Sequence, residues 1–170
     1  EDYAYAVFGL LELFAADPDP AWLAWAITLQ ERQDELFWDA EGGGWFSTTG
    51  GDPHILLRMK DTYDGAEPTA SSVAAANLLT LSHLVDRPEW RERLERTLRL
   101  FGPQLEATGR AVPMMAGVLS VYHSRPAHVV TSVAHIVRIV VRCAVAVVIP
   151  RPLGSSSGAP SGPVASSFRT

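Results

Sequence analysis

The residues that could do chemistry are densest in residues 64–72, DGAEPTASS, directly before an apolar stretch. This segment holds two carboxylates, Asp64 and Glu67, three positions apart. Paired carboxylates can act as general acid and general base when burial and mutual repulsion drive their pKa values apart. Asp64 and Glu67 are therefore the candidate catalytic residues.

The same segment also has a structural interpretation. Pro68 suits the first position of a helix, and Glu67 and Thr69 can cap that helix with support from its dipole. Asp64 is followed by glycine, which is an ordinary turn pair. Helix capping and ligand contact both remain open at this point.

The elements that would position these residues are helices. Five segments repeat apolar side chains at spacings of three and four residues, which is typical of amphipathic helices. They cover residues 3–14, 22–37, 68–81, 90–101 and 114–122. A turn rich in proline and aspartate joins the first two segments, which predicts an antiparallel hairpin. GWFSTT at residues 44–49 is short, aromatic and β-like, and it predicts a small β-ribbon.

The first hairpin repeats 68 positions later in the chain. LLEL at residues 10–13 aligns with LLTL at 78–81, and a Pro-x-Trp triplet begins both second helices. One hairpin cannot bury its own apolar face, so tandem hairpins predict an all-α solenoid or a closed toroid. The connection over residues 39–67 is long for a structureless loop, and such loops commonly carry function.

Charge divides the chain into two unlike parts. Residues 1–106 hold all 19 acids and 8 of the 14 Lys and Arg, a net charge of −11, whereas residues 107–170 hold six arginines and no acid. We therefore expect a domain over residues 1–128 and an unrelated, irregular or disordered tail over 129–170, such as a shifted reading frame or an alternative terminus.

Composition excludes several classes of partner. The acidic part has no basic stripe that would attract nucleic acid. The apolar run in the tail approaches membrane-spanning length, but Arg138 and Arg142 would lie near its middle at a cost of about 2.5–3.5 kcal/mol each. Cys143 is the single cysteine, and the five histidines lack metal-ligand spacing. We therefore expect no metal, no cofactor and no membrane span. No targeting signal is visible, and we expect a cytoplasmic protein.

Four segments taken in order suggest a family. They are EDYA at 1–4, LFWDAEGGGWF at 36–46, RMKDTYDGAEPTASS at 58–72 and NLLTL at 77–81. Together they resemble one region of the thioredoxin-domain proteins of the spermatogenesis-associated protein 20 type, over about residues 1–130. The family pattern has asparagine at Ser71 and usually tyrosine at Trp45. The family's thioredoxin domain and its redox cysteines are absent, so no redox role transfers.

The resemblance implies a partial (α/α) barrel related to N-acylglucosamine 2-epimerases and six-hairpin glycosidases. It would hold two hairpins and the start of a third, as a fragment of a longer protein. The repeat aligns Glu1-Asp2-Tyr3 with Thr69-Ala70-Ser71, which would place both segments on one rim. Carboxylates, cations and an aromatic ring there would suit a sugar or polyol. The predicted substrate-binding residues are Glu1, Asp2, Tyr3, Trp45, Arg58, Lys60, Asp61 and Ser71.

The sequence therefore favours a fragment of a carbohydrate-processing-like domain. Any reaction would be epimerisation or glycoside chemistry by acid-base carboxylates, on fold analogy alone. One alternative is a non-catalytic helical-repeat module that binds a partner, such as the missing part of its own parent chain. The other is a truncated or mis-framed product without a function of its own.

Overall fold

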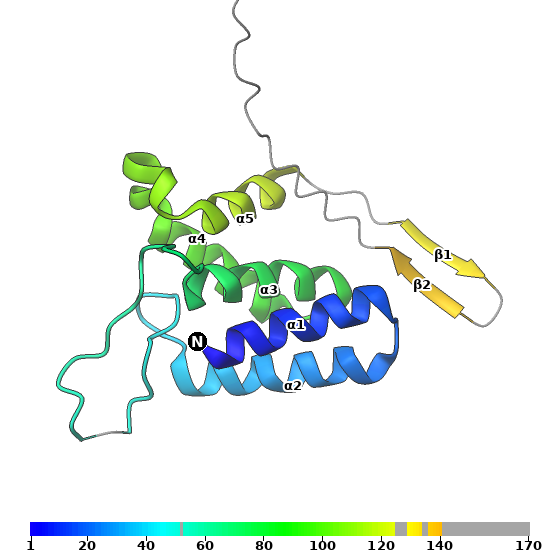
Figure 1. Cartoon of the computed structure of the whole chain (residues 1–170), viewed down its shortest axis with the longest axis horizontal. Coiled ribbons are helices and arrows are strands. Elements are labelled where there is room, and N and C mark those ends of the chain that lie inside the picture. The colour runs from blue at the N-terminus through cyan, green and yellow to red at the C-terminus, as the bar shows by residue number, and fades with distance from the viewer. Residues whose placement is uncertain (52, 125–128, 134–135, 141–170) are drawn as a thin grey trace, which may run out of the picture.

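The structure is a computed structural model, and it describes residues 1–51, 53–124, 129–133 and 136–140. The described residues up to 124 form helices and the segments that connect them. The helices are α1 (Asp2–Ala16), α2 (Pro20–Phe37), α3 (Ala70–Leu84), α4 (Pro88–Thr108) and α5 (Pro113–Ser124), with a 3-10 turn η1 (Gly109–Ala111) before α5. The expected all-α class is confirmed for this part of the chain (Figure 1).

Two short strands follow the helices. β1 (Val129–Val133) and β2 (Ile136–Val140) pair antiparallel, with Val129 opposite Val140. Their sequences, VVTSV and IVRIV, are rich in β-branched residues that favour strands. These residues are strands where an irregular tail was expected, and the rest of that range lies outside the described residues.

The helix starts follow from local capping. Asp19 precedes α2, and its side chain accepts a hydrogen bond from the Ala21 N–H at 2.8 Å. Thr69 caps α3 in the same way, because its Oγ1 accepts from the Ser72 N–H at 3.1 Å. Thr69 itself has an extended backbone, with φ −64° and ψ 154°. The helix therefore begins after Thr69, and the prediction that Pro68 is its first residue is wrong.

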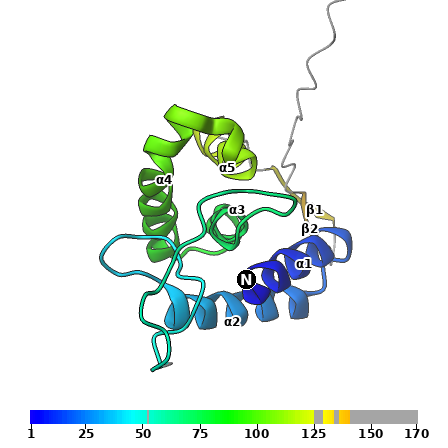
Figure 2. The ribbon, with the colours of Figure 1, turned by 60° about the vertical axis from the view of Figure 1, so that its left-hand side comes forward.

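The helices also follow the repeat. The first residues of α1 and α3 lie 68 positions apart, as do their last residues and the first residues of α2 and α4. Each pair forms a hairpin, and α3 packs against both α1 and α5. Figure 2 views the chain nearly along α3 and shows the other helices arranged around it. α3 is therefore the central element of the described part.

Repeat-related side chains differ in burial because their neighbours differ. Leu81 of α3 is 0% exposed, while its counterpart Leu13 of α1 is 47% exposed. α3 has a helix on either side, whereas α1 has the α3 neighbour on one side only among the described elements. Asn77 of α3 fixes that contact, since its Nδ2 donates to the Ala4 carbonyl of α1 at 2.8 Å.

This difference predicts unequal effects of the same substitution. Leu81→Ala should lower the free energy of unfolding by about 2–5 kcal/mol, because it opens a cavity in the core. Leu13→Ala, the repeat-matched control, should cost less than about 1 kcal/mol. Urea denaturation followed by circular dichroism measures both. Equal losses would contradict the inequivalence of the two positions.

Candidate functional site

The segment between α2 and α3, residues 38–69, begins with a tight glycine turn. Trp38 and Trp45 pair as an isolated antiparallel bridge across it. Gly43 and Gly44 have φ of +77° and +73°, a region that favours glycine. The structure thus shows one bridge around a turn, where the sequence predicts a β-ribbon.

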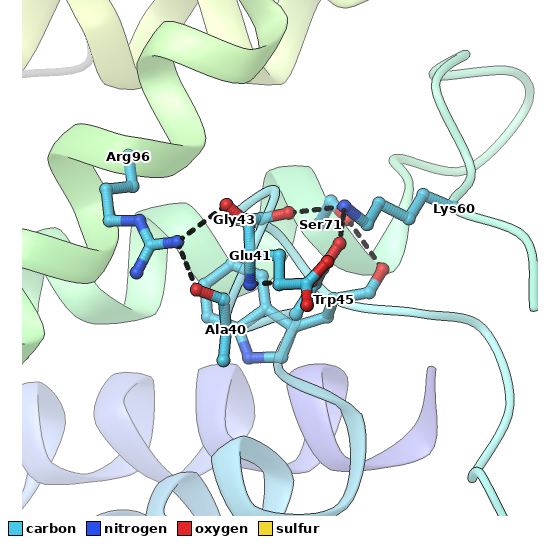
Figure 3. A network of polar contacts seen from close by, with 8 residues as sticks. Ala40, Glu41, Gly43, Trp45, Lys60, Ser71 and Arg96 are labelled. Carbon is cyan, nitrogen blue, oxygen red and sulfur yellow. Dashed lines mark hydrogen bonds and ion pairs between the residues drawn. The ribbon is translucent and has the colours of Figure 1, made fainter.

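Two cations hold the glycine turn from opposite sides (Figure 3). Lys60 Nζ donates to Asp39 Oδ2 and to the Gly43 carbonyl, at 2.6 Å in each case. On the other side, Arg96 of α4 donates to the Ala40 carbonyl at 2.6 Å. The hydrogen bond from Lys60 lowers the pKa of Asp39 to about 2. The structure therefore places Lys60, a predicted ligand contact, in a bracing role.

The other predicted residues near this turn also take part in internal contacts. Trp45 is 2% exposed and its Nε1 donates to Asp34 Oδ1 at 2.9 Å. Arg58 donates to the Thr48 carbonyl at 3.0 Å and 2.9 Å through two nitrogens. Ser71 Oγ donates to the Trp45 carbonyl at 3.5 Å. The Trp45 ring, expected to stack on a sugar, packs in the core here.

Asp34 is a site residue that the sequence analysis missed. Its carboxylate accepts hydrogen bonds from Trp45, from Gln30 Nε2 at 2.9 Å and from Arg93 of α4 at 2.6 Å. Burial raises the pKa of Asp34, and the bonds from Trp45 and Arg93 oppose that rise. The signal in the sequence was an acid on an otherwise buried helix face, four residues after a glutamine. Asp34 ties α2, the glycine turn and α4 together.

Asp64 lies where two helices begin. Its Oδ1 accepts from the Thr69 N–H at 2.8 Å, and its Oδ2 accepts from the Met114 N–H at 3.0 Å. Its own N–H donates to the Ala111 carbonyl at 2.8 Å, and the residue is 5% exposed. A carboxylate is stabilised at a helix N-terminus by the unpaired N–H groups and the dipole. Asp64 therefore links the starts of α3 and α5.

The first turn of α1 reaches the same end of the molecule. The Tyr5 hydroxyl donates to the Pro68 carbonyl at 2.7 Å. The pKa of Tyr5 is raised, first by burial and then by the negative charges of Glu67, Glu1 and Asp64. The structure thus brings three of the predicted acids together around Tyr5. We call Glu1, Tyr5, Asp64 and Glu67 the acidic rim.

Tyr5 was not predicted, although its position offered a signal. It lies one helical turn after Glu1, on a helix expected to begin at the rim. The remaining predicted residues are placed separately: Asp2 and Asp61 are exposed, and the Tyr3 ring lies 5.9 Å from the Phe37 ring, centroid to centroid. In the described part of the chain, no side-chain hydrogen bond joins these three residues to the acidic rim.

The described part of the chain holds neither a metal-binding cluster nor a membrane-spanning helix. Among the described residues, no group of three or more His, Cys, Asp or Glu side chains is arranged to hold a metal ion. None of the described helices combines the length and apolar character needed to cross a bilayer.

The sequence of this chain is similar to part of several known proteins. Over 121 residues, 71% of this chain, the sequence is 43% identical to spermatogenesis-associated protein 20 of Homo sapiens. The chain is homologous to a segment of that protein. It spans 15% of the length of the human protein. No protein-family profile and no solved structure matches the chain.

Two further relatives support the same assignment. Spermatogenesis-associated protein 20 of Rattus norvegicus is 44% identical over 123 residues, 71% of this chain and 15% of the rat protein. An uncharacterised protein of Caenorhabditis elegans is 35% identical over 119 residues, 70% of this chain and 16% of its own length. The expected resemblance to spermatogenesis-associated protein 20 is thus confirmed over the matched residues.

The position of Asp64 generates a stability prediction. Asp64→Asn replaces one carboxylate oxygen by a donor amide, which opposes the N–H of Thr69 or of Met114. We expect a loss of about 1–3 kcal/mol in the free energy of unfolding. Glu67→Gln, an exposed change three residues away, should alter it by less than about 0.5 kcal/mol. Denaturant titration of both variants checks this, and an unchanged Asp64→Asn would contradict the double cap.

The Lys60–Asp39 pair generates a pH prediction. Because the folded pKa of Asp39 lies below its unfolded value of 3.8, the pair stabilises the fold above about pH 4. That stabilisation should disappear as the pH falls from about 4 to about 2. Asp39→Asn should remove about 1–2 kcal/mol at pH 7 and flatten this part of the profile. Unfolding measured at several pH values tests it, with Glu12→Gln on the exposed side of α1 as the control.

Proposed function

We propose that this chain is part of an (α/α) barrel whose acidic rim binds a sugar or a related polyol. The observation that carries the proposal is the hydrogen bond from the Tyr5 hydroxyl to the carbonyl of Pro68, the residue next to Glu67, at 2.7 Å; the charges of Glu67 and Glu1 also raise the pKa of Tyr5. Carboxylates accept hydrogen bonds from ligand hydroxyls, and a tyrosine can both donate and accept them. Such convergent polar groups are typical of sites for polyhydroxylated ligands.

The repeat and the common end of three helices support the proposed barrel. Direct hydrogen bonds join Tyr5 in the first turn of α1 to Pro68 before α3, and Asp64 to the starts of both α3 and α5. Such toroids are built from successive hairpins whose first helices begin at the same end of the molecule and which pack side by side. Further hairpins would come from the larger part of the homologues, which this chain does not span.

The chemistry at this rim divides between two kinds of carboxylate. Both oxygens of Asp64 accept N–H groups, so proton transfer by Asp64 would require the release of one helix cap. Glu67 is exposed beside Tyr5, so proton transfer by Glu67 would not require the release of a helix cap. In our proposal Asp64 shapes the rim while Glu67 and Glu1 contact the ligand. Any reaction would be epimerisation or glycoside hydrolysis with Glu67 as the acid-base group.

A second candidate function is protein binding without catalysis. Exposed apolar side chains on the connection between α2 and α3 favour it, because clustered apolar groups on a surface commonly mark interaction sites. They are Leu56 (99% exposed), Leu57 (73%), Met59 (58%) and Tyr63 (67%). In this case the rim would be structural and the connection would contact the partner.

Ligand titration distinguishes the two candidates. The full chain is titrated with glucose, mannose, N-acetylglucosamine and sorbitol while backbone NMR shifts are recorded. We expect shifts at the rim with at least one of these ligands and an affinity about tenfold lower for Glu67→Ala, because a charge-assisted hydrogen bond is lost. Leu57→Ser should bind as the wild type does. A wild-type chain that shows no shifts with the whole panel would overturn sugar binding.

A further inference from the structure

The antiparallel strands β1 and β2 form a two-stranded sheet, and among the described residues no third strand covers either of its edges. Within the described elements, each of these strands packs mainly on the other. A two-stranded hairpin alone is marginally stable in water, and a third strand or a packed helix stabilises it. An unpaired edge also offers a row of N–H and C=O groups to another chain. The sheet can therefore accept a further strand.

The sequences of the two strands favour pairing with another chain. β1 reads VVTSV and β2 reads IVRIV, so most of their residues are β-branched and neither strand contains proline. Segments with high β-propensity and little charge are the ones that form strands between molecules. Arg138 is the one charged residue in these two sequences. Its position determines which edge a second copy of the chain can use.

Charge distinguishes the two edges when the incoming strand belongs to a second copy. Closed dimers commonly have twofold symmetry, in which the same surface of each copy meets. When two identical strands pair antiparallel in full overlap, the middle residue of each lies opposite its own counterpart. For β2 that residue is Arg138, and like charges directly opposite each other are destabilising. For β1 it is Thr131, and a threonine pair across two strands is favourable.

We propose that the open edge of β1 is a homodimer interface, at which β1 pairs with β1 of a second copy. The product is a four-stranded sheet with the order β2-β1-β1-β2. Val129 lies opposite Val133 of the second copy in this sheet, and Thr131 lies opposite its own counterpart. Each hairpin gains the third strand that it lacks on its own. The interface uses neither the acidic rim nor the connection between α2 and α3, so it is independent of the proposed function.

Disulfide trapping tests the register of this dimer. Thr131→Cys is made in a Cys143→Ser chain, so that position 131 holds the only cysteine. Directly opposite Cα atoms in an antiparallel pair lie about 4.5–5.5 Å apart, a separation that a disulfide can span. We expect a covalent dimer after mild oxidation, seen by non-reducing electrophoresis. Leu13→Cys in the same background, at an exposed position of α1, measures crosslinking by random collision.

Charge at position 131 separates the dimer from the hairpin. Thr131 is the register partner of Arg138 within the chain, so Thr131→Glu adds a pair of opposite charges to the hairpin. In the dimer the same change places two glutamates opposite each other. We expect the dimer dissociation constant, measured by analytical ultracentrifugation, to rise about fivefold. Thr131→Gln is the neutral control, and mixing the Thr131→Glu chain with a Thr131→Lys chain should restore the affinity.

The outcomes that would contradict the interface are distinct. Circular dichroism first confirms that the helices of each variant are folded. A chain that sediments as a monomer at every concentration would overturn the proposal, as would a dimer that Thr131→Cys does not trap or that Thr131→Glu does not weaken. Association into species larger than a dimer would mean that both edges add strands, and it would overturn the proposal as well. None of these measurements involves a sugar, so a negative result leaves the proposed function untouched.

Discussion

The carboxylate of Asp64 is the interaction on which the described structure depends most. It lies between the N-termini of two helices and accepts one backbone N–H from each, so it satisfies donors that the helices cannot satisfy themselves. Its burial makes each bond costly to break, because an unpaired N–H or carboxylate oxygen would be left without water. The common end of α3 and α5, and hence the acidic rim, is set by this one side chain.

Bracing contacts and exposed carboxylates belong to different residues at that end. Lys60, Arg96 and the Trp45–Asp34 pair hold the glycine turn against the helices. Glu1 and Glu67 remain exposed beside Tyr5. In the proposed function, the buried Trp45–Asp34 bond and the part-buried Lys60–Asp39 bond keep the geometry of the site, while Glu1 and Glu67 stay in solvent for ligand contact.

The helices and their repeat could be predicted because they depend on local patterns. Apolar spacing, the Pro-x-Trp triplets and Thr69 as a cap are all readable within a few residues. The roles of Asp64, Trp45 and Lys60 were not readable, since each is decided by a partner far along the chain. Asp64 resembles a turn residue until Met114 is known to lie beside it. The residue types of Trp45 and Lys60 suggested ligand contact. In the structure Trp45 is buried and Lys60 is hydrogen-bonded within the chain.

The hydrogen bond between Asp64 and Met114 also has a consequence for the order of folding. Each helical hairpin closes a short turn, whereas this bond joins residues 50 positions apart and the Tyr5–Pro68 bond joins residues 63 apart. Contacts of long sequence separation form after local ones, because the entropy of closing the loop is lost first. During synthesis, Asp64 is added to the chain 50 residues before Met114. The hairpins can therefore assemble on the growing chain, and the rim is completed only when α5 arrives.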